Sequence, residues 1–375
     1  MRMLMLVGLV ACGGGGPSDA VDAAPDSAIT VCKPGTFTRT AAFTTTSGAP
    51  FHPEGITADP YVIFEDGRYR MWFTSVDWTA GTVFDATDRV MGTAYAESTD
   101  GVVWDDAAFR PAAGHKVKLV LAPDGWDSEG VETVSIARTG GELVLFHTGD
   151  RPDGTNAIGR ARSSDGRTWM RDAGPVLVPE AAWEQPLCLD PPACTQHLGG
   201  VLEPAFVVDN AGANHVWYAA MGIRGSDLTM QIGHASSTDG ITWQRGTDPV
   251  FVPGATGAWD EILVSHTNVV PDPAGGFHLF YQGISRAQQD VCSVEGSCPF
   301  YTPGSIGHAF SEDGETWVRD PDPILEPTGS DGFFVGGPAA VIRDGRVELF
   351  YFGIASQDDA GVLRAHLARA TAECS

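Results

Sequence analysis

The sequence predicts an all-β protein, specifically a five-bladed β-propeller with four antiparallel strands in each blade. The chain of 375 residues contains 46 glycines and 25 prolines, which suit many short strands better than long helices. Four segments share an Asp-Gly turn motif followed by a tryptophan. Five segments repeat an apolar strand, a tight turn and an aromatic strand, and five such repeats arranged in a ring make a propeller.

The Asp-Gly motif marks the turn between the third and fourth strands of a blade. Its aspartates are 65, 74 and 74 residues apart, and the tryptophan is expected to begin the outer strand and to pack against the neighbouring unit. A strand of the form apolar-Gly-x-Ala precedes each copy. The four copies are Ser98–Trp104, Ser163–Trp169, Ser237–Trp243 and Ser311–Trp317.

Each blade begins with an apolar strand that turns into an aromatic one. The fifth unit has no Asp-Gly-Trp motif, so its outer strand is missing. The β-rich segment Thr36–Thr46 precedes the first unit and is expected to supply that strand and close the ring. The apolar strands are expected at 61–64, 134–137, 205–208, 268–270 and 339–342, and the aromatic strands at 70–74, 143–147, 216–218, 279–281 and 349–352.

The composition excludes several classes of function. The chain has 23 Lys and Arg against 48 Asp and Glu, a formal net charge of −25. Nucleic acids and anionic membrane surfaces need clustered basic residues, so neither is an expected partner. Hydrophobic residues make up 43% of the chain, enough for a full core, and no apolar run reaches the roughly 18 residues of a membrane-spanning helix.

The N-terminus has the pattern of a bacterial lipoprotein signal peptide, expected over residues 1–11. A short positive region and an apolar run lead into Leu9-Val10-Ala11-Cys12, which fits the lipobox, although a chance cysteine is the alternative. Residues 12–31 form an acidic, Gly-rich segment that is typical of a flexible linker. We therefore expect a lipid anchor at Cys12 and a place in the cell envelope. Gly13 favours the outer membrane.

Six of the seven cysteines remain when Cys12 is set aside. An even number in an oxidising compartment predicts disulfide bonds, and fifteen pairings are possible. The preferred pairs are Cys188–Cys194 and Cys292–Cys298, which close short loops, and Cys32–Cys374, which would join the two ends of a domain over residues 32–375. Metal ligation is the alternative, but no C-x-x-C motif occurs.

The candidate functional residues lie where the first strand of each blade begins, because these strands line the central channel of a propeller. Aligning each strand on the glycine of the following turn selects Asp59, Glu132, Glu203, His266 and Gly337. Carboxylates held close together repel one another and raise each other's pKa values. Such a cluster indicates a metal, a cationic ligand or proton chemistry, while capping of strands in a solvated channel is the structural alternative.

The segment Thr57–Ile63, which contains Asp59-Pro60, and the following Asp66–Ser75 resemble the first blade of glycoside hydrolase family 43. The resemblance extends over residues 50–370. That family and its β-fructosidase and levansucrase relatives are five-bladed propellers. The resemblance implies a glycosidase for arabinose- or xylose-type oligosaccharides or polysaccharides.

The resemblance also assigns roles to the candidate residues. Asp59 would be the general base, Glu203 the general acid and Glu132 the group that tunes the pKa of the acid, with a calcium ion near His266 in the channel. This chain has Glu132 where the family has Asp, and Leu202-Glu203-Pro204 where the family has Glu-Gly-Pro. An inverting mechanism would place the two catalytic carboxyls about 6.5–9.5 Å apart with a water between them.

Sugar binding would need aromatic side chains at the rim of the channel. Several aromatic residues lie in the segments between predicted strands, and packing between blades is the alternative role for each. The candidates are Trp78, Trp126, Trp183, Trp259 and Phe300.

Two other functions stay open. A non-catalytic propeller that binds a glycan or a protein would agree with Glu132 and with a lipid anchor. A sialidase is the second, because Ser-x-Asp-Gly-x-Thr-Trp resembles the sialidase Asp-box, but sialidases have six blades and an arginine triad, and the aligned inner positions here hold no arginine. For the glycosidase we expect a monomer with a carbohydrate substrate.

Overall fold

The computed structural model describes residues 31–48, 56–78, 89–105, 125–224, 227–286, 304–357 and 363–375. These residues belong to one compact unit, Val31–Ser375. Apart from strands they contain two short 3-10 helices, η1 (Ala182–Glu184) and η2 (Gly329–Asp331), so the all-β prediction is confirmed. No helix within these ranges has the length and apolarity to cross a bilayer.

Within each of the first four repeat units, consecutive strands pair antiparallel in chain order. The first unit holds β3 (Ile56–Glu65), β4 (Arg68–Trp78), β5 (Arg89–Ser98) and β6 (Val103–Asp105). The second holds β7 (Gly130–Thr139), β8 (Glu142–Asp150), β9 (Thr155–Ser163) and β10 (Met170–Arg171). The third holds β12 (His197–Val208), β13 (Asn214–Arg224), β14 (Asp227–Ser237) and β15 (Gln244–Arg245), preceded by β11 (Leu187–Cys188). The fourth holds β16 (Leu263–Pro271), β17 (Phe277–Ile284), β18 (Ser305–Ser311) and β19 (Val318–Arg319).

The last unit is completed from the start of the chain. β20 (Phe334–Arg343), β21 (Arg346–Gln357) and β22 (Leu363–Glu373) pair antiparallel, and β1 (Thr38–Arg39) pairs antiparallel with β22. β2 (Thr44–Thr45) instead runs parallel to β6. The predicted outer strand within Thr36–Thr46 is therefore present as β1.

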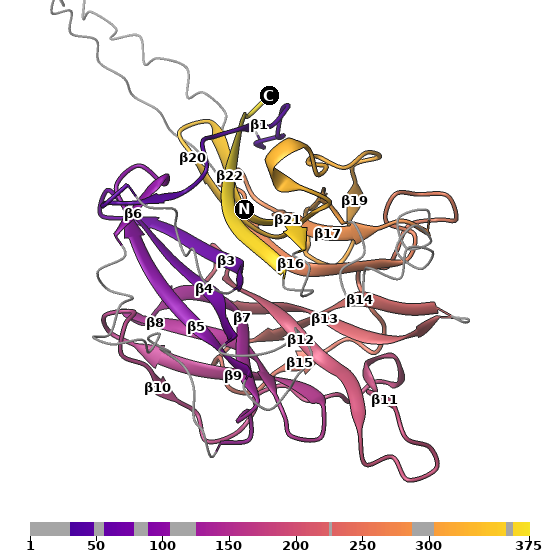
Figure 1. Cartoon of the computed structure of the whole chain (residues 1–375). Helices are drawn as coiled ribbons and strands as arrows, with labels where there is room; N and C mark the ends of the chain where they lie inside the picture. The colour runs from indigo at the N-terminus through magenta and orange to yellow at the C-terminus, as the bar shows by residue number, and fades with distance from the viewer. Residues whose placement is uncertain are drawn as a thin grey trace, which may run out of the picture. The chain divides into compact units, whose positions relative to one another are not determined.

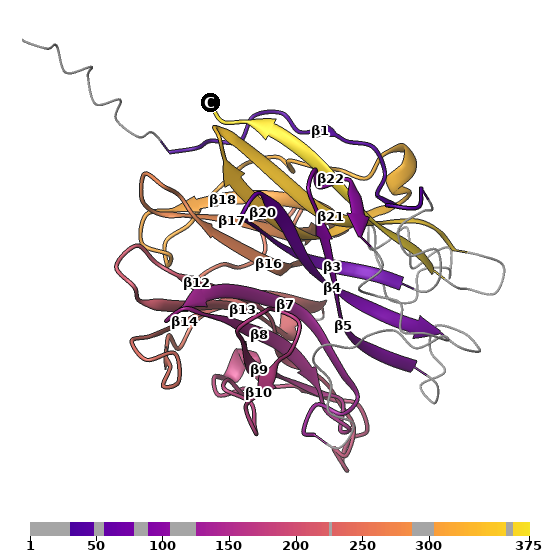
Figure 2. The same cartoon turned by 90° about the vertical axis from the view of Figure 1, so that its left-hand side faces the viewer.

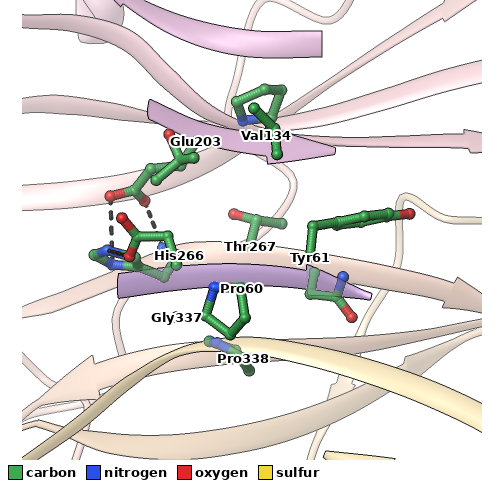
Figure 3. Close-up of a pocket in the computed structure, with 12 residues that line it drawn as sticks. Pro60, Tyr61, Val134, Glu203, His266, Thr267, Gly337 and Pro338 are labelled. Atoms are coloured by element: carbon green, nitrogen blue, oxygen red, sulfur yellow. Dashed lines mark hydrogen bonds and ion pairs between the residues drawn. The ribbon is translucent and has the colours of Figure 1, made fainter. Parts of the chain in front are cut away.

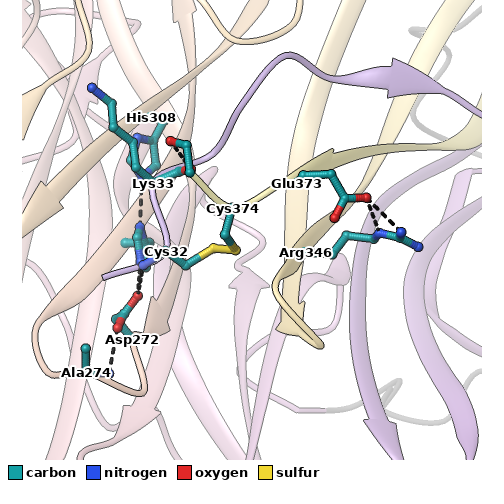
Figure 4. The surroundings of a disulfide bond; sticks show 10 residues. Cys32, Lys33, Asp272, Ala274, His308, Arg346, Glu373 and Cys374 are labelled. Carbon is teal, nitrogen blue, oxygen red and sulfur yellow. Dashed lines mark hydrogen bonds and ion pairs between the residues drawn. A yellow bond between two sulfur atoms is a disulfide. The ribbon is translucent and has the colours of Figure 1, made fainter. Parts of the chain in front are cut away.

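A disulfide bond between Cys32 and Cys374 lies next to this pairing, with 4.8 Å between the two Cα atoms. The main-chain N–H of Cys32 also donates a hydrogen bond of 2.8 Å to Asp272 Oδ2, as Figure 4 shows. The two ends of the compact unit are thus held together covalently and are attached to the fourth unit by a buried hydrogen bond.

The first strands of the five units contact one another in cyclic order. β3 contacts β7, β7 contacts β12, β12 contacts β16, β16 contacts β20, and β20 contacts β3. Figure 1 shows β3, β7 and β16 near the middle of the unit and the short strands β6, β10 and β19 toward its edge, and Figure 2 gives the view turned by 90°. Residues on the first strands are therefore the ones that meet across a common centre.

The motif tryptophans pack between units, which confirms that prediction. Each tryptophan ring contacts an aromatic ring of the preceding unit. For Trp104 of the first unit, the contacted ring belongs to the last unit. The ring-centroid distances are 6.4 Å for Trp169–Trp72, 5.5 Å for Trp243–Phe146, 6.2 Å for Trp317–Trp217 and 6.2 Å for Trp104–Phe350.

The aspartates of the Asp-Gly motifs serve the turns. In the second copy, Asp165 Oδ1 accepts the N–H groups of Arg167 and Thr168, each at 2.8 Å. These hydrogen bonds lower the pKa of Asp165 to about 2. The same pattern recurs in the other three copies, so these carboxylates have a structural role.

A buried acid between successive units binds an arginine from a short outer strand. The pairs are Asp127–Arg171, Glu184–Arg245 at 2.6 Å, Asp260–Arg319 at 2.6 Å and Asp331–Arg39 at 2.5 Å. Each acid is at most 1% exposed. Three of the arginines follow the motif tryptophan by two residues, and Arg39 follows Phe37 in the same way. β1 therefore makes the same contact in the last unit that β10, β15 and β19 make in theirs.

Candidate active site

Five equivalent bulges face one cavity. In each first strand the pairing with the next strand shifts register at one place, and the residue at that shift has a positive φ. The φ values are 48° for Asp59, 45° for Thr133, 54° for Glu203, 47° for His266 and 56° for Gly337. A non-glycine residue in this region costs about 1–3 kcal/mol, and such residues cluster at functional sites.

The bulge residues and those that follow them line a narrow cavity, part of which Figure 3 shows. The volume that they enclose is about 30 Å³. Pockets for small molecules typically have about 300–1,000 Å³, so these residues provide the floor of a site and have room only for ordered water.

His266 lies between the two carboxylates at the centre of this floor. Its Nε2 is 3.1 Å from Asp59 Oδ1, and its Nδ1 is 3.4 Å from Glu203 Oε1. The main-chain N–H of His266 also donates to Glu203 Oε2 at 2.5 Å. Figure 3 shows Glu203 directed at His266 from the neighbouring strand. One imidazole ring therefore links the predicted general base to the predicted general acid.

The environment shifts the pKa values of this cluster. Burial raises the pKa of Glu203, and the charge of Asp59 raises it further against the lowering effect of His266. Burial alone would lower the pKa of His266, but the carboxylates of Glu203, Asp59 and Glu132 raise it to about 9. His266 is therefore an imidazolium at neutral pH, and a buried carboxyl with a raised pKa has the property that a general acid needs.

Threonines from the second strands hold two of the bulges. The N–H of Thr133 donates to Thr74 Oγ1 at 3.1 Å, and the N–H of Glu203 donates to Thr148 Oγ1 at 2.7 Å. The register position of these threonines is occupied in the third unit by Ala219, which has no hydroxyl. The N–H of the next bulge residue, His266, is accepted by the Glu203 carboxylate instead. Ala219 thus leaves this N–H free to meet the acid.

The structure corrects one member of the predicted set, because the bulge of β7 is at Thr133 and not at Glu132. The turn after β7 contains two glycines, Gly140 and Gly141. Counting eight residues back from the second glycine reaches Thr133, just as counting eight back from Gly67 reaches Asp59. Gly141, and not Gly140, is therefore the glycine equivalent to Gly67. Glu132 is opposite Thr148 in the sheet and is not one of the residues that line the cavity, although its charge acts on His266.

Two of the predicted sugar-binding tryptophans pack inside their own units. Trp126 stacks on His147 with ring centroids 6.0 Å apart, and Trp259 stacks on Tyr281 at 5.5 Å. A Cβ added at Gly159 would lie 2.8 Å from the first indole, and one at Gly307 would lie 2.5 Å from the second. The glycine of the repeated apolar-Gly-x-Ala strand therefore makes room for the indole. Neither tryptophan lines the cavity, and a sugar contact by either stays an untested prediction.

The other predicted residues are placed as follows. Trp183 stacks on Tyr218 at 6.1 Å in the same manner as the two tryptophans above. The bond Cys188–Cys194 is formed in the loop before β12. Trp78 ends β4, and its side chain is outside the described part of the structure. Cys12, Cys292, Cys298 and Phe300 lie outside the described residues.

The groups around His266 are not arranged to coordinate the predicted calcium ion in this structure. Both ring nitrogens face carboxylates, and calcium prefers oxygen ligands. Within the described ranges, no group of three or more His, Cys, Asp or Glu side chains is arranged to hold a metal ion. Calcium near His266 stays a prediction from resemblance.

No protein-family model matches the sequence, and no curated protein matches it. Solved structures do match. A BT0996 complex with RGII has a TM-score of 0.64 at 17% identity over 91% of this chain and 92% of that one. A thermostable family-43 glycoside hydrolase has a TM-score of 0.59 at 19% identity over 84% and 91%. An N-acetylgalactosamine deacetylase from F. plautii, in complex with blood group B trisaccharide, has a TM-score of 0.56 at 13% identity over 92% and 95%. The chain therefore shares its fold with solved carbohydrate-active enzymes, glycoside hydrolases among them.

Proposed function

We propose that this protein is a glycosidase in which Asp59 is the general base and Glu203 the general acid. One observation carries the proposal. The two carboxylates occupy equivalent bulges on β3 and β12, face the same cavity and are linked by His266. A shared fold with glycoside hydrolases supports it.

We also propose that the fold is a five-bladed β-propeller closed by β1. The cyclic contacts among the first strands support five blades. The packing of Trp104 on Phe350 and the ion pair of Arg39 with Asp331 support closure between the first and last units.

The proposed chemistry follows from the charges. Asp59, beside the imidazolium, would activate a water molecule, and Glu203, whose pKa is raised by burial, would protonate the leaving oxygen. Inversion requires a water between the two carboxyls, which His266 bridges here, so inversion is proposed from the resemblance to family 43 alone. By the resemblance to family 43, the proposed substrates are arabinose- or xylose-type oligosaccharides or polysaccharides.

The test uses the soluble piece Cys32–Ser375 and a panel of aryl α-L-arabinofuranosides, aryl β-xylosides and oligosaccharides. Glu203→Gln and Asp59→Asn should each lower kcat by about 10²–10⁴-fold. Glu373→Gln, on an exposed carboxylate paired with Arg346, is the matched control and should retain full activity. Following the anomeric proton by NMR distinguishes inversion from retention. Turnover that survives in both site variants would refute the assignment.

A non-catalytic glycan-binding module is the second candidate. The specific observation in its favour is that His266 pairs with both carboxylates, so each of them already has a cationic partner. Glycan binding without turnover on the whole panel would establish it. A sialidase has less support, because no arginine is among the residues that line the cavity in the described part of the chain.

We further propose that the protein is anchored by a lipid at Cys12 in the cell envelope, at the outer membrane. The lipobox-like motif and the acidic linker support this. Labelling with a radioactive fatty acid, with Cys12→Ser as the control, tests the anchor, and membrane fractionation tests the location. Metal analysis of the purified protein tests the calcium ion, and a preparation that is active without calcium would remove it.

A further inference from the structure

Two threonine hydroxyl groups, one of them fully buried, lie next to the main chain of Glu203. Thr148 on β8 is fully buried, and its Oγ1 accepts the N–H of Glu203 at 2.7 Å. The same Oγ1 is 2.5 Å from Oγ1 of Thr133, the bulge residue of β7. Thr133 is only partly buried and lines the cavity. The pair therefore connects the predicted acid to the cavity wall.

The direction of the hydrogen bond between the hydroxyls follows from counting donors. A hydroxyl carries one hydrogen and two acceptor lone pairs. If Thr133 donated to Thr148, the hydrogen of Thr148 would be left in a fully buried place where, within the described chain, no other acceptor contacts it. An unmet buried donor costs more than an exposed one. Thr148 therefore donates to Thr133 while it accepts from Glu203.

This arrangement leaves the hydroxyl hydrogen of Thr133, a residue that lines the cavity, without an acceptor among the described residues. We propose that Thr133 is a hydrogen-bond donor to a ligand oxygen that takes the place of an ordered water at this cavity, and that Thr148 is the positioning residue that orients this hydroxyl and fixes the main chain of Glu203. That the acceptor is a sugar oxygen rests on the function proposed above. One neutral donor at the second bulge thus accompanies the three ionisable side chains at the first, third and fourth.

The pattern in the neighbouring units sets this pair apart. In the first unit, Thr74 Oγ1 accepts the main-chain N–H of Thr133 in the same way. The hydroxyl of Thr133, however, is bonded to Thr148 and not to Thr74. In the third unit Ala219 has no hydroxyl to offer. Within the described chain, a contact between two hydroxyl groups at a bulge is found only in the second unit, next to the main chain of Glu203.

Neutron diffraction from a deuterated crystal of the Cys32–Ser375 piece tests the orientation without any substrate. We expect the deuterium between the two oxygens to belong to Thr148, and that of Thr133 to point into the cavity. A deuterium of Thr133 directed at Thr148 would overturn the proposal. This result does not depend on whether the protein hydrolyses glycosides.

The functional arm uses the best substrate of the panel above, or, if the protein only binds, the tightest glycan with its Kd. Thr133→Val should raise KM or Kd about 5- to 20-fold and change kcat by less than about 2-fold from the wild-type value. Thr133→Ser should restore the wild-type KM or Kd. Thr148→Val should raise KM and also lower kcat, because Glu203 loses the acceptor of its N–H, and Thr148→Ser should rescue both. Thr229→Val removes an equally buried hydroxyl, bonded to the carbonyl of Ile262, and is the matched control.

Unchanged KM in Thr133→Val, or equal losses in Thr148→Val and Thr148→Ser, would contradict the proposal. If nothing on the panel is bound or hydrolysed, the proposed function fails, and the neutron result still decides the orientation of the hydroxyl pair.

Discussion

Arg39 on β1 forms an ion pair of 2.5 Å with Asp331, a residue 292 positions later in the chain. Asp331 is 1% exposed and also accepts the hydroxyl of Tyr351 at 3.1 Å. In the other three described pairs of this kind the arginine follows the acid in sequence, so among the four this one joins the last unit to the N-terminal segment. The last unit therefore depends on an N-terminal residue for the partner of a buried carboxylate.

Replacing Arg39 by methionine should destabilise the protein by about 3 kcal/mol. Removing one partner of a buried ion pair typically costs about 3–5 kcal/mol, and the lower end applies because Arg39 is 28% exposed. Urea unfolding measures the loss. Arg346→Met breaks an exposed pair with Glu373 and should cost less than about 1 kcal/mol. Equal effects of the two substitutions would contradict the role of Arg39.

The two described disulfides should differ in their contribution to stability. Cys32–Cys374 spans 342 residues, whereas Cys188–Cys194 spans 6. Loop-closure entropy assigns about 6 kcal/mol to the first and about 2 kcal/mol to the second. Double alanine variants of each pair, unfolded in urea, give the comparison. A larger loss for the short loop would show that chain entropy is not the main effect.

Stability should decline as the pH rises through the titration of His266. Its pKa is raised from 6.5 to about 9, so its contribution is complete below pH 6.5 and is lost as the pH passes 9. The free energy of unfolding should fall by about 1–3 kcal/mol between pH 6.5 and pH 9.5. His266→Gln should lack this decline, and urea unfolding at three pH values tests both proteins. Parallel curves would mean that His266 does not titrate in this range.

Gly337→Ala should damage the site more than the fold. An added Cβ would lie 2.8 Å from the ring of Phe352 and 3.0 Å from the Cα of Asp59. Gly345→Ala is the matched control, because Gly345 also has a positive φ but no atom within 4 Å of an added Cβ. Each substitution should cost about 1–2 kcal/mol of stability from its backbone conformation. Only Gly337→Ala should also lower turnover or glycan affinity, by about 10-fold or more, and an intact site in that variant would contradict the close approach to Asp59.

Repetition in the sequence was sufficient to predict the strands, because each unit must bury the same kinds of side chain against its neighbours. The clearest cases are the motif tryptophans, whose packing between units follows from their spacing. The outer strand of the last unit was also predictable, both from the β-rich segment before the first unit and because Phe37-Thr38-Arg39 repeats the aromatic-x-Arg pattern of Trp169-Met170-Arg171.

The site was less predictable, because a bulge is set by backbone geometry and leaves a weak trace in sequence. Two adjacent glycines after β7 made the alignment ambiguous by one residue, and a shift of one residue in a strand exchanges one face for the other. Thr133 was missed for this reason. The contacts of His266 with Asp59 and Glu203 come from strands far apart in sequence, so no local pattern encodes them.

Pairing of β1 with β22 has a consequence for biosynthesis. Because synthesis proceeds from the N-terminus, β1 is exposed long before β22 has been made. This strand therefore has no pairing partner while the first four units fold. The last unit becomes complete only when the C-terminal residues have been synthesised. The disulfide bond between Cys32 and Cys374 can form only after that point. A prematurely terminated product would carry a free Cys32 thiol, which makes that thiol a marker by which incomplete chains can be recognised chemically.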